Sequence, residues 1–125
     1  MANTTYALVP GAGGDAWYWH LLVPLLEERG HDAVVVSLPA ADDSAGWTEY
    51  ADSVVEAIGD RTGVILVAQS LGGFSAPLVS ERVPVELLVL LNAMIPLPGE
   101  TGAEWWSNTG QGAAMHDRLA TGFAG

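Results

Sequence analysis

Residues 64–77 read VILVAQSLGGFSAP, and this stretch decides the predicted fold. Residues 64–68 form an unbroken apolar run, which is typical of a short strand that is buried on both faces. A serine among small residues follows at once in the segment AQSLGG, residues 68–73. This pattern predicts a sharp turn from strand to helix, with the hydroxyl of Ser70 at the carboxyl edge of a sheet.

Apolar runs alternate with helix-length segments on both sides of this turn. The predicted strands are residues 5–9, 33–38, 64–68 and 86–91, and the predicted helices are residues 17–29, 48–58 and 71–83. Short apolar runs separated by helices are typical of a parallel sheet. We therefore predict an α/β fold, a parallel sheet of about four strands with flanking helices and right-handed crossovers.

Helix boundaries are less clearly marked than the strands. Pro24 predicts either a late start or a kink in the first helix, and Pro77 lies inside the third, whose apolar periodicity still predicts a helix. Thr48 is the expected N-cap of the second helix. The expected inward faces of the first two helices consist of Trp19, Leu22, Leu25, Leu26, Ala51, Val54, Val55 and Ile58.

Composition and charge exclude several classes of protein. The chain has 125 residues, with 15 Asp and Glu against four Arg and no Lys, a formal net charge of −11 and no Cys. Four basic side chains cannot form the basic face that a nucleic-acid binder needs. Without Cys there is neither a disulfide nor a thiolate metal site, and no His pair has ligand spacing. We expect no metal, no cofactor and no nucleic-acid partner.

No segment predicts a membrane location. Residues 1–6 lack the positive charge and the apolar stretch of a signal peptide. The longest apolar runs are far shorter than the ~20 residues that span a bilayer. We expect a cytoplasmic protein that does not contact membranes.

Ser70 is the candidate nucleophile. Nucleophilic catalysis by serine needs an exposed hydroxyl, a base within hydrogen-bond reach and donors for the developing oxyanion. The residues two before and two after such a serine must be small because the strand and helix backbones pass close together, and here they are Ala68 and Gly72. The alternative is that Ser70 only caps the following helix.

Residues 68–72 resemble the nucleophile elbow of the α/β-hydrolase family, G-x-S-x-G, with Ala68 in place of the first glycine. Residues 8–40, LVPGAGGDAWYWHLLVPLLEERGHDAVVVSLPA, resemble the start of its hydroxynitrile-lyase and plant-esterase branch. Residues 92–100, NAMIPLPGE, resemble the point where that branch begins its cap. The resemblance covers residues 4–107.

The resemblance implies a site and an activity. Ser70 would attack carboxylic esters or similar small substrates, or would act in a lyase. The backbone N–H groups of Ala12 and Leu71 would form the oxyanion hole, with Gly72 and Gly73 as the elbow glycines.

The family's catalytic acid and histidine have no match in this sequence. They follow the serine along the chain in that family, after later strands. We therefore expect an incomplete, truncated or frameshifted hydrolase, or half of an assembly that is completed by a homo-oligomer or a missing C-terminal half. The expected division is residues 1–92 as the hydrolase core and residues 93–125 as the start of a cap or a disordered tail.

Other residues could contribute to this site. His20 and His31 are expected at a helix and a turn without a catalytic role, and a base from His116 would require the tail to fold over the elbow. Asp15 and Glu100 lie on loops that could approach Ser70, although such carboxylates are usually solvated. The expectation for Trp47, Trp105 and Trp106 is either an acyl pocket or ordinary packing.

Two other interpretations stay open. Residues 11–16, GAGGDA, fit the dinucleotide-binding pattern G-x-G-x-x-A, although Ser37-Leu38-Pro39 stands where its ribose-binding acid is expected. The chain could also be a non-catalytic fragment, since the leucine-rich run at residues 87–91 would form an exposed apolar edge that promotes aggregation.

Overall fold

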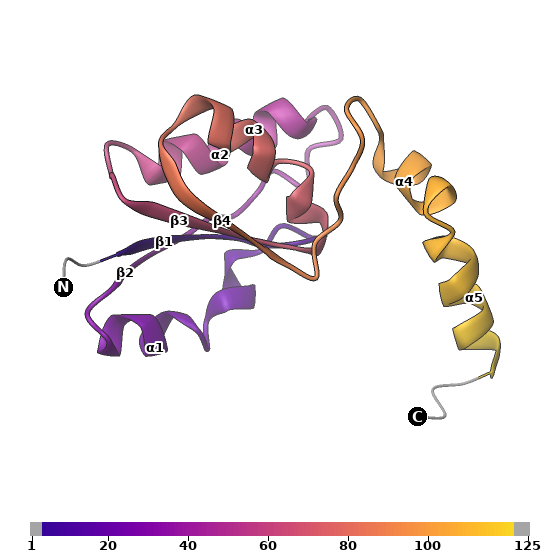
Figure 1. Ribbon diagram of the computed structural model, residues 1–125, viewed down its shortest axis with the longest axis horizontal. Helices are drawn as coiled ribbons and strands as arrows, with labels where there is room; N and C mark the ends of the chain where they lie inside the picture. Colours follow the sequence, from indigo (N-terminus) through magenta and orange to yellow (C-terminus); the bar gives the residue numbers. More distant parts are fainter. Residues whose placement is uncertain (1–3, 122–125) are drawn as a thin grey trace. The chain divides into compact units, whose positions relative to one another are not determined.

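One parallel sheet forms the centre of the computed structural model, which describes residues 4–121. Its strand order is β2-β1-β3-β4, from β1 (Thr5–Val9), β2 (Asp32–Val35), β3 (Val64–Gln69) and β4 (Val85–Leu91) (Figure 1). The predicted α/β fold with four parallel strands is confirmed. The second strand is shorter than predicted, because residues 36–38 continue beyond the last ladder pair without strand structure.

Helices cover the two faces of the sheet unequally. The helices α2 (Trp47–Ile58) and α3 (Ala76–Arg82) lie on one face, and α1 (Val23–Glu28) lies on the other (Figure 1). Leu66 and Ala68 belong to the larger core beneath α2, whereas Val67 belongs to a smaller cluster with Trp19 on the α1 side. Successive residues of β3 are therefore buried on opposite faces, which explains its unbroken apolar sequence.

The α2 helix buries the residues that the periodicity predicts. Ala51, Val54 and Ile58 are fully enclosed, and Val55 packs against the same core. The prediction of Thr48 as the N-cap was wrong. Gly46 occupies that position, and its N–H donates to Oε2 of Glu49 at 2.8 Å.

Both prolines lie in the first turn of a helix. Pro24 belongs to the first turn of α1, and Pro77 to that of α3. A first-turn residue has no intrahelical acceptor for an N–H, so proline costs little there. A 3₁₀ helix precedes each, η1 (Ala16–Trp19) and η2 (Ser70–Gly73). The late start predicted for the first helix is confirmed, and the predicted third helix consists of two pieces.

Part of the predicted inner face of the first helix is not buried. Leu22 and Leu26 pack against the small cluster around Leu8, whereas Leu25 is 48% exposed. The break between η1 and α1 changes the direction of the side chains, so a single helical periodicity does not hold across residues 17–29.

The outer edge of β4 carries exposed leucines. β4 is the last strand of the sheet, and Leu87, Leu90 and Leu91 are 54%, 41% and 43% exposed. The register pairs Ile65 with Leu87 and Val67 with Val89, which places Leu87 on the α1 side of the sheet. The expected exposed apolar edge is therefore present in the described part of the chain.

Residues Pro96–Gly125 form a compact unit separate from Met1–Ile95. The described part of this unit contains α4 (Gly102–Asn108) and α5 (Gln111–Thr121). Thr101 and Glu104 form a capping box at the start of α4, with N–H to side-chain distances of 2.7 and 3.2 Å. That this region begins a cap stays a prediction. No helix among residues 4–121 is long and apolar enough to cross a lipid bilayer.

The central position of β3 yields a stability prediction. Replacing Leu66, which is fully buried, by Ala should lower the free energy of unfolding by about 2–5 kcal/mol, since the cavity is enclosed by α2 and β1. Leu21→Ala is the matched control, because Leu21 is 73% exposed and its loss should cost less than about 0.5 kcal/mol. Urea denaturation followed by circular dichroism measures both. Equal losses for the two variants would contradict the assigned core.

Candidate active site

Ser70 lies in a strained bend directly after β3. Its φ is 51°, in the left-handed region that residues other than glycine rarely adopt. Such a conformation costs on the order of 1–3 kcal/mol and is concentrated at functional sites. The residue is half-buried, and its hydroxyl has no hydrogen-bond partner within residues 4–121. A strained serine with an unpaired hydroxyl at a sheet edge is suited to nucleophilic attack.

The bend is possible because its neighbours lack side chains. A Cβ added to Gly72 would lie 3.3 Å from the carbonyl oxygen of Pro10 and 3.4 Å from Cβ of Ala68. Strand, elbow and the loop after β1 therefore meet at Gly72, which is buried. This is the close passage of backbones from which the sequence argument inferred small residues at positions 68 and 72.

The loop after β1 runs against the serine. A Cβ added to Gly11 would lie 2.5 Å from Oε1 of Gln69 and 2.9 Å from Cβ of Ser70, so only glycine fits without displacement of a neighbour. A turn closed by the N–H of Gly14 on the carbonyl oxygen of Gly11, at 3.1 Å, shapes this loop. The first two residues after the strand are thus held beside the bend.

Two backbone donors next to Ser70 are free within the described chain. The N–H of Ala12 has no hydrogen-bond partner there, and that of Leu71 belongs to the first turn of η2, where no intrahelical acceptor is available. Unpaired N–H groups beside a nucleophile can hold the oxygen of a tetrahedral intermediate. Their role as an oxyanion hole stays a prediction.

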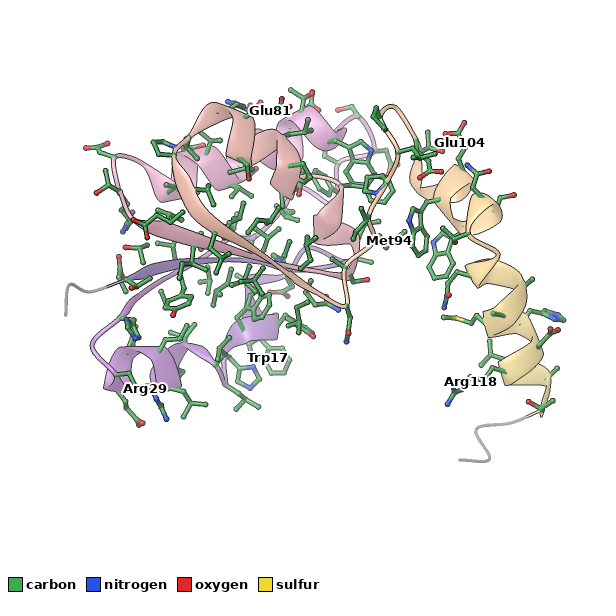
Figure 2. The ribbon with its side chains drawn as sticks, viewed as in Figure 1. Trp17, Arg29, Glu81, Met94, Glu104 and Arg118 are labelled. Carbon is green, nitrogen blue, oxygen red and sulfur yellow. The ribbon has the colours of Figure 1, made fainter. Side chains whose placement is uncertain are left out.

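The histidines are occupied elsewhere. Nδ1 of His20 lies 2.8 Å from the carbonyl oxygen of Trp17, and its ring stacks on the Trp17 indole at 3.9 Å, on the α1 side of the sheet (Figure 2). His31 accepts a hydrogen bond from the N–H of Thr4 at the start of β1, the edge opposite Ser70. In the second unit, His116 lies 3.9 Å from Asp117. Within residues 4–121, no imidazole is hydrogen-bonded to Ser70.

Neither carboxylate suggested by the sequence contacts the serine. Asp15 accepts from the N–H of Trp17 at 2.9 Å and so caps η1. Glu100 accepts from Asn108 at 2.6 Å and from the N–H of Leu97 at 3.1 Å. Both carboxylates stabilise their own local turns.

One carboxylate in the loop after β2 has a shifted pKa. Hydrogen bonds from the hydroxyl and the N–H of Ser44, at 2.6 and 2.9 Å, lower the pKa of Asp42. The contact orders the turn before α2 and leaves Asp42 as a local turn residue.

The tryptophans belong to different units. Trp47 stacks on Phe74, with ring centroids 4.6 Å apart, and Phe74 directly follows η2, so this pair packs behind the elbow. Trp105 and Trp106 form an edge-to-face pair within α4. An acyl pocket shared by the three stays a prediction.

Local structure argues against the dinucleotide interpretation of residues 11–16. In that motif the glycine loop opens directly into an α-helix whose N-terminus binds the pyrophosphate. Here the loop leads into the 3₁₀ helix η1, and α1 begins only at Val23. Ser37, at the end of the second strand segment, accepts from the N–H of Ala16 at 3.2 Å. Among residues 4–121, no cluster of three His, Asp or Glu could hold a metal ion.

A sequence model of the alpha/beta hydrolase family matches residues 7–125. The chain belongs to this family. It is 34% identical over 103 residues to norfluorocurarine synthase 1 from Strychnos sp, and 32% identical over 108 residues to polyneuridine aldehyde esterase from Rauvolfia serpentina. It is also 33% identical over 103 residues to an alpha-hydroxynitrile lyase from Arabidopsis thaliana. The predicted resemblance to plant esterases and hydroxynitrile lyases is confirmed.

These matches cover most of this chain and less than half of each relative. They include 73%, 77% and 73% of this chain but 39%, 41% and 40% of the respective relatives. The chain thus spans about two-fifths of the length of the curated relatives that it matches. The crystal structure of polyneuridine aldehyde esterase superposes with a TM-score of 0.74 at 27% identity, over 89% of this chain and 48% of that one.

The contact between Gly11 and Ser70 can be tested by stability. Gly11→Ala should lower the free energy of unfolding by about 1–3 kcal/mol, because the new methyl group overlaps Gln69 and Ser70. Ala12→Ser, at an exposed position of the same loop, should change it by less than about 0.5 kcal/mol. Urea titrations of both variants measure the difference. An unchanged midpoint for Gly11→Ala would show that the loop does not run against the bend.

Proposed function

We propose that this chain carries the nucleophile and the oxyanion-binding groups of a serine hydrolase that acts on carboxylic esters of small molecules. The observation that carries the proposal is the left-handed bend at Ser70, whose unpaired hydroxyl lies beside the free N–H groups of Ala12 and Leu71. Relatives that are named as esterases at about one-third identity support the substrate class.

In this mechanism, Oγ of Ser70 forms a bond to the carbonyl carbon of the ester while its proton passes to a base. The N–H groups of Ala12 and Leu71 donate to the carbonyl oxygen as it becomes an oxyanion. The C–O bond to the alcohol then breaks, the base returns the proton to the leaving oxygen, and an acyl-serine remains. Water, activated by the same base, hydrolyses that ester and frees Ser70.

The proposed base is a histidine of polypeptide outside this sequence. Each histidine among residues 4–121 is engaged away from Ser70, and the matched relatives are more than twice as long as the segment they share with this chain. Such a histidine could come from a further part of the same protein or from another subunit. The formal charge of −11 disfavours nucleic acids and anionic surfaces as partners, so the proposed ligand is a small neutral ester.

A lyase is the second candidate. It is supported by 33% identity to an alpha-hydroxynitrile lyase over 103 residues. In that reaction the serine would take the hydroxyl proton of a cyanohydrin, and cyanide would leave as the carbonyl forms. Release of cyanide from mandelonitrile, without cleavage of an ester, would favour the lyase over the hydrolase.

The proposal predicts acetylation of Ser70 by an activated ester. The purified chain, incubated with 4-nitrophenyl acetate and imidazole as a diffusible base, should acquire one acetyl group on Ser70, located by peptide mass spectrometry. Oxyanion donors and binding alone leave roughly a 10³-fold acceleration when a triad member is missing, so the rate should exceed that of a free serine peptide by about that factor.

Two variants control this experiment. Ser70→Ala should abolish the acetylated peptide, whereas Ser80→Ala on α3, whose hydroxyl bonds the carbonyl oxygen of Ala76, should react like the wild type. If Ser70 in the folded chain reacts no faster than the free peptide, the chain is a non-catalytic fragment and the proposal fails.

A further inference from the structure

The strands β3 and β4 end together, and each is followed by a strained residue. Gln69 and Leu91 are their last register pair. The next residues, Ser70 and Asn92, have φ values of 51° and 46°. They are the two non-glycine residues with positive φ in the described part of the chain. The nucleophile bend thus has a neighbouring bend of the same handedness at the same edge of the sheet.

The chain that leaves β4 crosses over the nucleophile bend. The N–H of Met94 donates to the carbonyl oxygen of Ser70 at 2.8 Å, and Met94 is only 6% exposed. Figure 2 shows Met94 on the segment that follows β4. The contact continues on Gly73, where an added Cβ would lie 1.8 Å from the carbonyl oxygen of Met94 and 3.3 Å from Cβ of Ala93. Gly73 therefore leaves the space that the crossing segment fills.

The hydrogen bond from Met94 acts on the peptide unit that contains the proposed oxyanion donor. The carbonyl of Ser70 and the N–H of Leu71 belong to one planar trans peptide, so they point in opposite directions. A donor that holds this carbonyl oxygen fixes the direction of the Leu71 N–H as well. Without it, the peptide could rotate, and the N–H would lose its aim at the carbonyl oxygen of a substrate.

We infer that residues 92–94 are a positioning element for the nucleophile and for the Leu71 oxyanion donor. This inference rests on the proposed function and adds to it residues that never touch the substrate. Asn92 supplies the left-handed turn that sends the chain back, Met94 supplies the donor, and Gly73 supplies the space. The strain at Ser70 is held by a segment that is 22 residues away in the sequence, since the bond joins residues 70 and 94 across β4.

Variants of Met94 isolate the hydrogen bond from the side chain. Met94→Pro removes the donor N–H, and Met94→Ala removes most of the side chain but keeps the donor. In the acetylation assay with 4-nitrophenyl acetate and imidazole, Met94→Pro should react roughly 10- to 100-fold more slowly than Met94→Ala, because a misdirected donor loses the transition-state contact. Equal rates for the two variants, with circular dichroism showing both folded, would overturn the inference.

Variants of Asn92 test the bend with a rescue. Asn92→Val should slow acetylation of Ser70 roughly 10-fold or more, because a β-branched residue resists the left-handed conformation. Asn92→Gly should restore the wild-type rate, because glycine adopts that conformation freely. A purely structural role for the asparagine side chain would instead make the glycine variant as slow as the valine variant. If Met94→Pro does not fold, this pair decides the question.

Amide exchange separates this inference from the proposed function. In the wild type the Met94 amide should exchange at least about 10-fold more slowly than an unstructured amide, because it is buried and bonded. Asn92→Val should remove this protection and Asn92→Gly should keep it. A protected Met94 amide without acetylation of Ser70 would refute the proposed function alone. An unprotected Met94 amide in the folded wild type would refute the positioning role, whatever the reactivity of Ser70.

Discussion

Three backbone segments pass within contact distance of one another around Ser70, and the arrangement of the sheet edge depends on this close approach. A Cβ on Gly11, Gly72 or Gly73 would touch or overlap a neighbouring segment. The left-handed bend at Ser70 is strained by itself, so the surrounding contacts must hold it. The glycines allow these contacts to form, and the buried strand beneath them provides the stability that offsets the strain.

The topology of the sheet explains why these segments meet. The register pairs Val9 with Ala68 and Gln69 with Leu91, so β1, β3 and β4 end side by side. In a parallel sheet all carboxyl ends lie at one edge, and the loops that leave adjacent strands become neighbours. The same framework occurs in relatives named as an esterase and as a lyase. The chemistry therefore depends on which groups are brought to this edge, and the sheet supplies the nucleophile and its backbone donors.

Strands were predictable from the sequence because buried parallel strands need continuous apolar runs, and the bend at Ser70 was indicated by its small neighbours. Helix starts were less predictable. The 3₁₀ helices before Pro24 and Pro77 continue the apolar periodicity of the helices that follow, so the patterns merge in the sequence. The N-cap at Gly46 carries no side-chain signal, and Thr48 was chosen wrongly for that reason. The α5 helix (Gln111–Thr121) was missed because its residues are exposed on all sides and show no apolar face.

The crossing of Met94 over Ser70 had no signal in the sequence, because a backbone hydrogen bond between distant residues depends on tertiary structure alone. The backbone at position 70 also limits which amino acids could serve as the reactive group. At a φ of 51°, a second substituent on Cβ crowds the main chain, so threonine would be strained there, although its hydroxyl has similar reactivity. Cysteine has an unbranched Cβ like serine and fits the same conformation. The geometry of this one turn thus permits an exchange of oxygen for sulfur, while it disfavours the addition of a single methyl group.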